Sequence, residues 1–210
     1  MEKTLTSSKT FRYFTHGNPE KAKYALYVLH GYGQLASFFI RKFQDLGEEY
    51  YIIAPEGMHR FYLNGSSGRV GASWMTKEAR EEDITDTQNW LSTLQKEVNS
   101  NSSFEKEVVL GFSQGGATAA RWNTINSIPN QIYWASIFPP DVAIHNLITN
   151  ASDSKKYFVL GSNDEYFDET QQKEIFSFYK KNGFKTIEFT GNHVIENKIL
   201  KKVLSDLHLD

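Results

Sequence analysis

Short apolar runs rich in β-branched and aromatic residues recur along the chain, separated by longer and more polar stretches. The first five runs are apolar at nearly every position, which is typical of strands covered on both faces of a parallel sheet. The runs are Tyr24–Leu29, Tyr50–Ala54, Glu107–Leu110, Gln131–Ile137 and Lys156–Leu160, with a sixth at Thr186–Phe189. Lys9–Thr15 alternates instead, and the turn residues His16-Gly17-Asn18-Pro19 that follow it predict an N-terminal hairpin.

The stretches between these runs carry apolar residues at three- and four-residue steps, the period of amphipathic helices. The predicted helices are Glu81–Val98, Gln114–Ile125, Thr170–Asn182 and Asn197–Leu207. Strands that alternate with helices indicate an α/β fold, with a mostly parallel central sheet and helices on both faces. Functional groups in such sheets lie on loops at the carboxyl ends of the strands. No repeat or linker divides residues 1–210, so we expect one domain.

Composition narrows the classes of function. The chain of 210 residues has a net charge of about −2 with acids and bases well mixed, which argues against a nucleic-acid binder and an anionic-membrane binder. It contains no cysteine, which excludes disulfides, thiolate metal sites and a cysteine nucleophile. No apolar run approaches the ~20 residues that span a bilayer. Because the N-terminus also lacks a signal-peptide pattern, we expect a cytoplasmic protein.

Ser113 stands among glycines where an apolar run ends and a helix pattern begins, in Gly111-Phe112-Ser113-Gln114-Gly115-Gly116. A strand-to-helix turn this sharp strains the middle residue and directs its side chain out of the sheet edge. Glycines on either side remove the side chains that would collide there. A phosphate-binding loop would need a different glycine spacing or a lysine. Ser113 is therefore a candidate nucleophile, and the alternative is a tight turn with an idle serine.

A serine hydroxyl needs a base to take its proton, and that base is most often a histidine. Three histidines follow Ser113 in the chain: His145, His193 and His208. Only His193 lies in a loop between a predicted strand and a helix, at the edge where Ser113 is expected. It is the candidate base.

An acid should orient the imidazole, and Asp164 comes just after the predicted strand that ends at Leu160. Glu165, Asp168 and Glu169 are close enough in sequence to compete for this role. Asp168 also precedes a predicted helix, where an aspartate commonly serves as a cap. We favour Asp164.

Acyl transfer also needs hydrogen-bond donors for the developing oxyanion. The backbone N–H of Gln114, at the start of the predicted helix, is one candidate. The second is the N–H of Tyr32, in the glycine-containing loop His30-Gly31-Tyr32-Gly33 after an early strand. His30 itself is interpreted as a structural residue that ties loops together.

These motifs, in this order along the chain, resemble those of the α/β-hydrolase superfamily. Gly-Phe-Ser-Gln-Gly-Gly is similar to the phospholipase/carboxylesterase family, which includes acyl-protein thioesterases. The resemblance implies hydrolysis of carboxylic esters or thioesters through an acyl-enzyme, without a cofactor or a metal. Two segments depart from the family: Asp164 is not followed by the usual Val-Pro, and the oxyanion loop lacks a Gly-Asp. Both departures bear on the identity of the substrate.

The long stretch Glu56–Arg80 is predicted to form an irregular pocket wall, with His59, Phe61, Trp74 and Met75 as candidate substrate-binding residues. The alternative is that these side chains only pack over the sheet edge.

Residues 138–155 leave room for a helix and a loop but not for a lid domain, so an open site is expected.

Two other functions remain compatible with the sequence. The same triad could act on a peptide or lactone bond, or the chain could be a noncatalytic binding protein on a hydrolase scaffold. The oligomeric state is not predicted.

Overall fold

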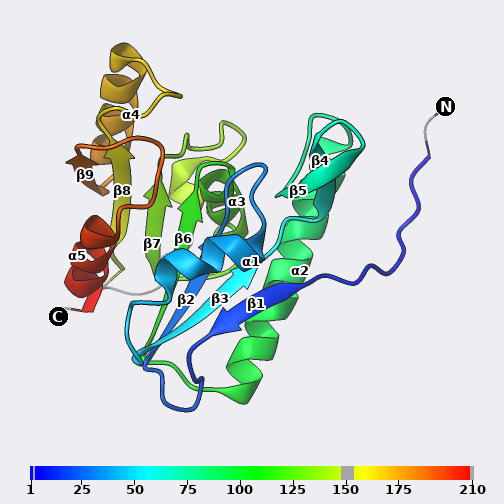
Figure 1. The fold of residues 1–210 in the computed structure, drawn as a ribbon, viewed down its shortest axis with the longest axis horizontal. Helices are drawn as coiled ribbons and strands as arrows, with labels where there is room; N and C mark the ends of the chain where they lie inside the picture. The colour runs from blue at the N-terminus through cyan, green and yellow to red at the C-terminus, as the bar shows by residue number, and fades with distance from the viewer. Residues whose placement is uncertain (2, 148–153, 209–210) are drawn as a thin grey trace.

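The computed structural model describes residues 1, 3–147 and 154–208, and its centre is a seven-stranded sheet (Figure 1). The strand order is β1-β3-β2-β6-β7-β8-β9, and every neighbouring pair is parallel except β1 with β3. The strands are β1 (Tyr13–His16), β2 (Tyr24–Leu29), β3 (Tyr50–Pro55), β6 (Lys106–Phe112), β7 (Asn130–Trp134), β8 (Lys156–Gly161) and β9 (Lys185–Phe189). The prediction of a mostly parallel α/β sheet is confirmed.

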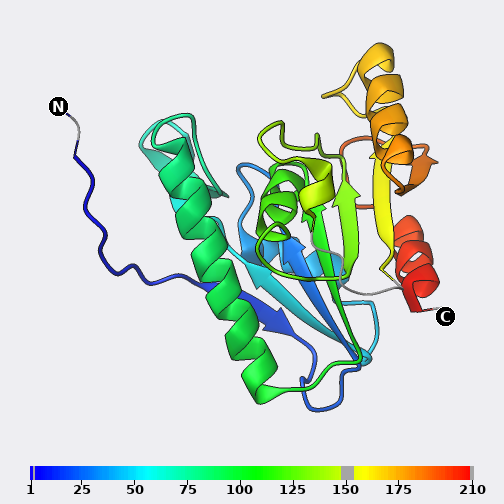
Figure 2. The same cartoon turned by 180° about the vertical axis from the view of Figure 1, so that it is seen from behind.

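Helices cover both faces of this sheet, as the alternating pattern predicted. The short α1 (Ala36–Phe39), continued by the 3-10 turn η1 (Ile40–Phe43), lies on one face with α5 (Asn197–His208) (Figure 1). The opposite face carries α2 (Arg80–Asn101), α3 (Gln114–Trp122) and α4 (Glu169–Lys181) (Figure 2). The sheet is thus covered by two helical layers, which explains why β2, β6, β7 and β8 are buried at nearly every position.

The prediction of an N-terminal hairpin, in which β1 would pair with β2, is wrong. The first strand does not pair with β2 but runs antiparallel to β3, which therefore lies between them. Arg12, just before β1, donates to the buried Glu56 carboxylate after β3, with Nε 2.6 Å from Oε1. This ion pair favours the observed pairing, because an unpaired buried carboxylate would be costly. The strand also begins later than predicted, since Phe11 leaves the sheet to stack on Trp90, with ring centroids 4.9 Å apart.

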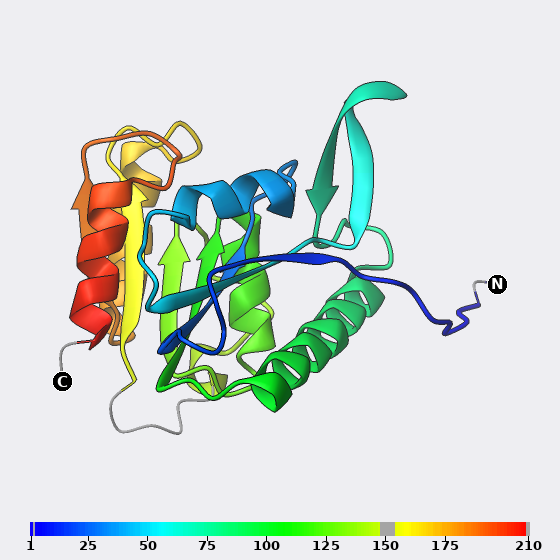
Figure 3. The same cartoon turned by 60° about the horizontal axis from the view of Figure 1, so that its bottom comes forward.

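Part of the predicted irregular stretch 56–80 forms a regular structure. Strands β4 (His59–Asn64) and β5 (Ser67–Ser73) pair as a two-stranded antiparallel sheet that projects from the body (Figure 3). We call residues 59–73 the hairpin arm. The two turn residues are Gly65-Ser66, and glycine with φ +64° at the first turn position is a hairpin signal that the sequence carries.

The connection between β7 and β8 contains only one short element among its described residues, the 3-10 turn η2 (Ile144–Asn146). Residues 148–153 of the segment expected to be too short for a lid lie outside the described part of the chain. In the described ranges, no helix has the length and apolar character needed to cross a bilayer.

Candidate active site

Ser113 occupies a strained turn between β6, which ends at Phe112, and α3, which begins at Gln114. Its backbone has φ +54° and ψ −121°, a conformation that costs a non-glycine residue about 1–3 kcal/mol. The Ser113 N–H donates to Trp134 O at 2.9 Å, and the Gly116 N–H donates to Ser113 O at 2.9 Å. These bonds hold the turn in place, so that Ser113 is half-buried at the carboxyl edge of the sheet.

Two glycines allow the turn to pack this closely. A Cβ atom on Gly111 would overlap the backbone of Gly115, and one on Gly115 would overlap the carbonyl oxygen of Leu29. A side chain on Gly111 would therefore force the end of β6 away from the start of α3, and one on Gly115 would push the nucleophile turn away from β2. The glycine spacing of the motif is required by this backbone packing.

Asp164 and His193 are in direct contact. His193 Nδ1 lies 2.7 Å from Asp164 Oδ2, and the carboxylate residue is only 2% exposed. The other carboxylate oxygen, Oδ1, accepts a hydrogen bond from the Tyr166 N–H at 3.0 Å. Both oxygens are thus engaged, which fixes the orientation of the carboxylate and of the imidazole that it holds.

The competing acids have other partners. Asp168 caps α4, where it exchanges hydrogen bonds with the N–H and side chain of Gln171. Glu169 pairs with Lys173 on the exposed surface of the same helix. Glu165 accepts from the His193 N–H at 3.2 Å, and hydrogen bonds from its own N–H and from that of His193 lower the pKa of its carboxyl group.

The loop after β9 carries His193 back across the sheet toward β6. Along the way, the Trp134 indole N–H at the end of β7 donates to Val194 O at 2.9 Å. The imidazole then contacts the ring of Phe112, the residue before Ser113, with centroids 4.7 Å apart, and the ring of Tyr166 at 4.5 Å. Within the described residues, no hydrogen bond joins Ser113 Oγ to His193.

The loop after β2 passes against the nucleophile turn. A Cβ atom placed on Gly31 would lie 3.2 Å from the Cβ of Ser113. The next residue, Tyr32, donates its backbone N–H to no other group in the described chain, and the same holds for the N–H of Gln114. Both candidate oxyanion donors are therefore available to a ligand beside Ser113.

His30 is buried and ties three loops together, as the interpretation of it as a structural residue proposed. Its Nδ1 lies 2.8 Å from Gly31 O, and its Nε2 accepts from the Gly57 N–H at 2.9 Å. Its ring stacks on Trp74, whose indole N–H donates to His30 O. Burial lowers the pKa of His30 to about 4, so a neutral imidazole with its proton on Nδ1 satisfies these contacts.

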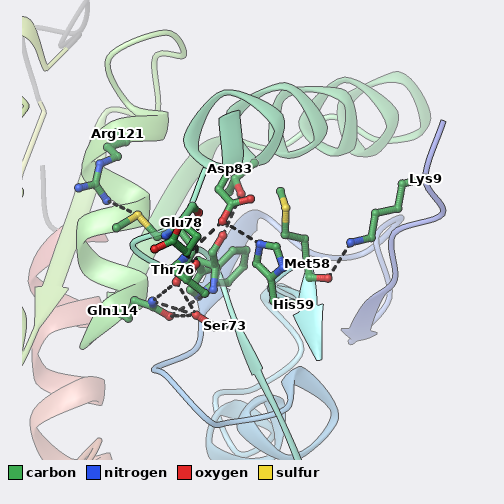
Figure 4. Close-up of polar contacts among 12 residues, drawn as sticks. Lys9, Met58, His59, Ser73, Thr76, Glu78, Asp83, Gln114 and Arg121 are labelled. Carbon is green, nitrogen blue, oxygen red and sulfur yellow. Dashed lines mark hydrogen bonds and ion pairs between the residues drawn. The ribbon is translucent and has the colours of Figure 1, made fainter. Parts of the chain in front are cut away.

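The carboxamide of Gln114 links the nucleophile turn to the base of the hairpin arm (Figure 4). Its Oε1 accepts from the Trp74 N–H at 3.2 Å, and its Nε2 donates to Met75 O at 3.1 Å. Ser73 Oγ lies within hydrogen-bond distance of the same carboxamide. The sequence predicts only a backbone role for Gln114; this side-chain contact joins residues 40 positions apart, which no local pattern reveals.

The four predicted substrate-binding residues lie in different surroundings. His59 points toward α2, where its Nε2 lies 2.9 Å from Asp83 Oδ2 without the alignment of a hydrogen bond (Figure 4). Phe61 packs on the Tyr32 ring at 5.1 Å, beside the oxyanion loop. Trp74 is 1% exposed and lies in the core. Met75 Sδ accepts from Arg121 Nη1 at 3.6 Å.

Exposed apolar side chains that were not predicted from the sequence surround the site. Tyr32, Ile137, Tyr166 and Val194 are all more than two fifths exposed. Each lies in a loop that follows a different strand of the sheet, on the edge that carries Ser113. Their positions just after the apolar runs are the signal that would have found them. They form an apolar rim at the site.

No group of three or more His, Asp or Glu residues in the described ranges is arranged to hold a metal ion.

Comparisons with known proteins agree with this architecture. The family model of the serine hydrolase (FSH1) family matches residues 20–202. The structure resembles the Bacillus cereus carboxylesterase with a TM-score of 0.68 at 14% identity, over 94% of each chain. It resembles the Zea mays acyl-protein thioesterase 2 with a TM-score of 0.66 at 18% identity, over 93% of this chain and 98% of that one.

A third similar structure is the phospholipase/carboxylesterase from Dyadobacter fermentans, with a TM-score of 0.63 at 18% identity, over 97% of this chain and 99% of that one. No curated protein matches the sequence. The expected α/β-hydrolase fold is confirmed, and the identities are too low to carry a substrate from one protein to another.

Proposed function

Because this chain belongs to the serine hydrolase (FSH1) family, we propose that it hydrolyses carboxylic esters or thioesters through an acyl-enzyme formed on Ser113. The observation that carries this function is the hydrogen-bonded Asp164–His193 pair, whose imidazole contacts the residue before Ser113. A buried carboxylate, an imidazole and a strained serine meet at one edge of a parallel sheet. That combination suits nucleophilic acyl transfer.

In the first half of the reaction, Ser113 Oγ attacks the carbonyl carbon while His193 Nε2 takes the hydroxyl proton. Asp164 keeps the proton of the neutral imidazole on Nδ1 and stabilises the imidazolium that forms, without accepting a proton itself. The N–H groups of Tyr32 and Gln114 donate to the oxyanion. The imidazolium then gives its proton to the departing alcohol or thiol, which leaves an acyl ester on Ser113.

In the second half, water replaces the leaving group. His193 takes a proton from the water as it attacks the acyl carbonyl, and the same two N–H groups again stabilise the oxyanion. The proton returns to Ser113 Oγ, and the carboxylic acid departs. No cofactor is needed to balance these steps. The apolar rim favours substrates with an apolar group next to the reacting carbonyl.

Labelling with a fluorophosphonate tests the nucleophile, because this reagent phosphonylates an activated serine. We expect labelling of the wild type and of Ser205→Ala, a control on the exposed side of α5, but not of Ser113→Ala. Hydrolysis of p-nitrophenyl esters should be lost in the same variant. Equal labelling of Ser113→Ala would refute the nucleophile assignment.

These two assays, together with hydrolysis assays on thioester, lactone and peptide substrates, separate the alternative functions. A protein that is neither labelled nor active on esters would be a binding protein. One that is labelled, and that cleaves lactones or peptides but not esters or thioesters, would use the triad on another bond.

A further inference from the structure

A groove of about 550 Å³ opens between the oxyanion loop, the α1–η1 segment and the hairpin arm. Its floor is apolar, and each of two walls contributes one cation. The apolar side chains are Leu35, Phe38, Phe39 and Val70, and the cations are Lys42 from η1 and Arg69 from β5. The catalytic steps proposed above use none of these side chains.

The groove shares a wall with the proposed oxyanion site. Gly33 and Gln34 line it, and Gln34 Oε1 accepts a hydrogen bond from the Gly31 N–H at 2.9 Å. Gly31 is the residue that packs against Ser113. On the floor, the Phe39 ring lies 5.9 Å from the Phe112 ring, next to the nucleophile. A molecule bound in the groove therefore lies beside the loop that carries the Tyr32 N–H.

The charges of this groove are not neutralised. No aspartate or glutamate lines it, and neither Lys42 nor Arg69 makes an ion pair or hydrogen bond with any described residue. A third cation, Arg41, lies over the ring of Phe38 at 4.7 Å. By contrast, the buried Arg121 on α3 is paired with Asp141. Unpaired cations beside an apolar floor attract an anion that carries a hydrocarbon chain.

We propose that this groove binds the far, anionic end of an amphiphilic ester or thioester, which presupposes the hydrolytic function proposed for Ser113. The reacting carbonyl lies at Ser113, the carbon chain covers Leu35 and Val70, and the anionic group lies between Lys42 and Arg69. The substrate class is therefore an acyl compound with a carboxylate or phosphate at the end of its chain, and not a neutral fatty ester.

Two substrates of equal chain length test this specificity: p-nitrophenyl hexanoate and the mono-p-nitrophenyl ester of adipic acid, which ends in a carboxylate. We expect the wild type to have the higher kcat/KM on the adipate ester. Lys42→Gln and Arg69→Gln should each lower that preference about fivefold, because exposed ion pairs are weak. The change should appear in KM, with hexanoate hydrolysis unaltered. Arg69→Lys should keep the preference.

The matched control is Lys173→Gln, an exposed cation on α4 that should leave the preference unchanged. Raising the ionic strength should reduce the preference for the adipate ester in the wild type and leave the hexanoate rate constant. The groove assignment is wrong if the Lys42→Gln/Arg69→Gln double variant keeps the wild-type ratio of the two kcat/KM values.

Binding to Ser113→Ala separates the groove from the catalytic proposal. Hexanoate, hexyl phosphate and neutral hexanol are titrated against this variant by calorimetry. Binding of either anion that is stronger than that of hexanol, and is weakened about fivefold on adding Arg69→Gln, supports the groove even if no ester is hydrolysed. The carboxylate and phosphate arms show which anion is preferred. Equal binding of all three molecules overturns the proposal even if Ser113 proves to be the nucleophile.

Discussion

Asp164 holds His193 by a single 2.7 Å contact between Oδ2 and Nδ1, while Asp168, four residues later, caps a helix instead. If asparagine replaced Asp164, its amide could donate to Nδ1 and favour the imidazole tautomer that cannot accept the Ser113 proton. We therefore expect Asp164→Asn to lower kcat on p-nitrophenyl esters by a factor on the order of 10³–10⁴.

Asp168→Asn is the matched control, since asparagine is an equally good helix cap. Its kcat should remain within about twofold of the wild type, because a surface cap contributes little to the site. Far-ultraviolet circular dichroism of both variants checks that the fold is retained. A larger loss in Asp168→Asn than in Asp164→Asn would transfer the acid role to Asp168.

The strained backbone of Ser113 makes a prediction about stability. Glycine adopts φ +54° and ψ −121° without a Cβ clash, so Ser113→Gly relieves the strain while it adds about 0.5–1 kcal/mol of backbone entropy cost. We expect a net gain of about 1 kcal/mol, measured as a higher midpoint of urea unfolding. Ser113→Ala keeps the Cβ and should show no such gain, although both variants are inactive. Equal stabilisation by alanine would show that the turn is not strained.

The contacts of the Gln114 side chain predict a positioning role. In Gln114→Leu the backbone N–H remains, but the bonds to the Trp74 N–H and Met75 O are lost. The Gln114 backbone, whose N–H is proposed to stabilise the oxyanion, is then no longer tied to the base of the hairpin arm. We expect kcat to fall about tenfold with little change in KM. This loss is smaller than the one that follows removal of an oxyanion hydrogen-bond donor itself. Gln95→Leu, which removes a carboxamide from α2 that pairs with Glu107, should leave kcat unchanged.

Burial of neutral His30 predicts how stability depends on pH. The folded pKa of about 4 lies below the ordinary 6.5, so the unfolded chain binds an extra proton as the pH falls from 6.5 toward 4. Stability is therefore lost over that window, by about 2 kcal/mol between pH 7 and pH 5. Urea unfolding at the two pH values measures this loss.

His30→Gln should abolish most of this slope, although it also lowers stability at pH 7. Asp141 does not interfere, because its pKa is lowered by hydrogen bonds from Arg121, and its contribution is lost only below the ordinary aspartate value of 3.8. A slope that persists in His30→Gln would assign the titration to another group.

Local patterns predicted the central sheet and the order of the site residues. Strands such as β2 and β6 are apolar at nearly every position because both of their faces are covered, and that pattern needs no knowledge of their partners. The nucleophile turn is partly local, since a side chain on Gly111 would clash with Gly115 and Gly116 a few residues on, whereas one on Gly115 would clash with the distant Leu29. The catalytic roles of Ser113, His193 and Asp164 stay predictions, as do cytoplasmic localisation and the absence of nucleic-acid partners.

Contacts between distant segments could not be predicted in this way. The pairing of β1 with β3 is supported by Arg12 and Glu56, between which the chain forms three strands, the helix α1 and the 3-10 turn η1. The helix α1 has only four residues, too few to show a period. Trp74 looked like a pocket residue because it lies among glycines and serines, whereas its stacking on His30 depends on the packing of two loops.

Among the described residues, the hairpin arm contacts the body mainly through its inner half, by the Gly33 N–H bond to Ala72 O, the carboxamide of Gln114 and the packing of Phe61 on Tyr32. Its outer half, around the Gly65 turn, supports no strand of the central sheet. Mutations there can accumulate during evolution without unfolding the protein. Replacement of the hairpin between Gly57 and Trp74 by a different one would change the substrate preference and leave the proposed reaction steps unchanged. Differences in substrate preference among related proteins would then arise mainly from sequence differences in the hairpin arm.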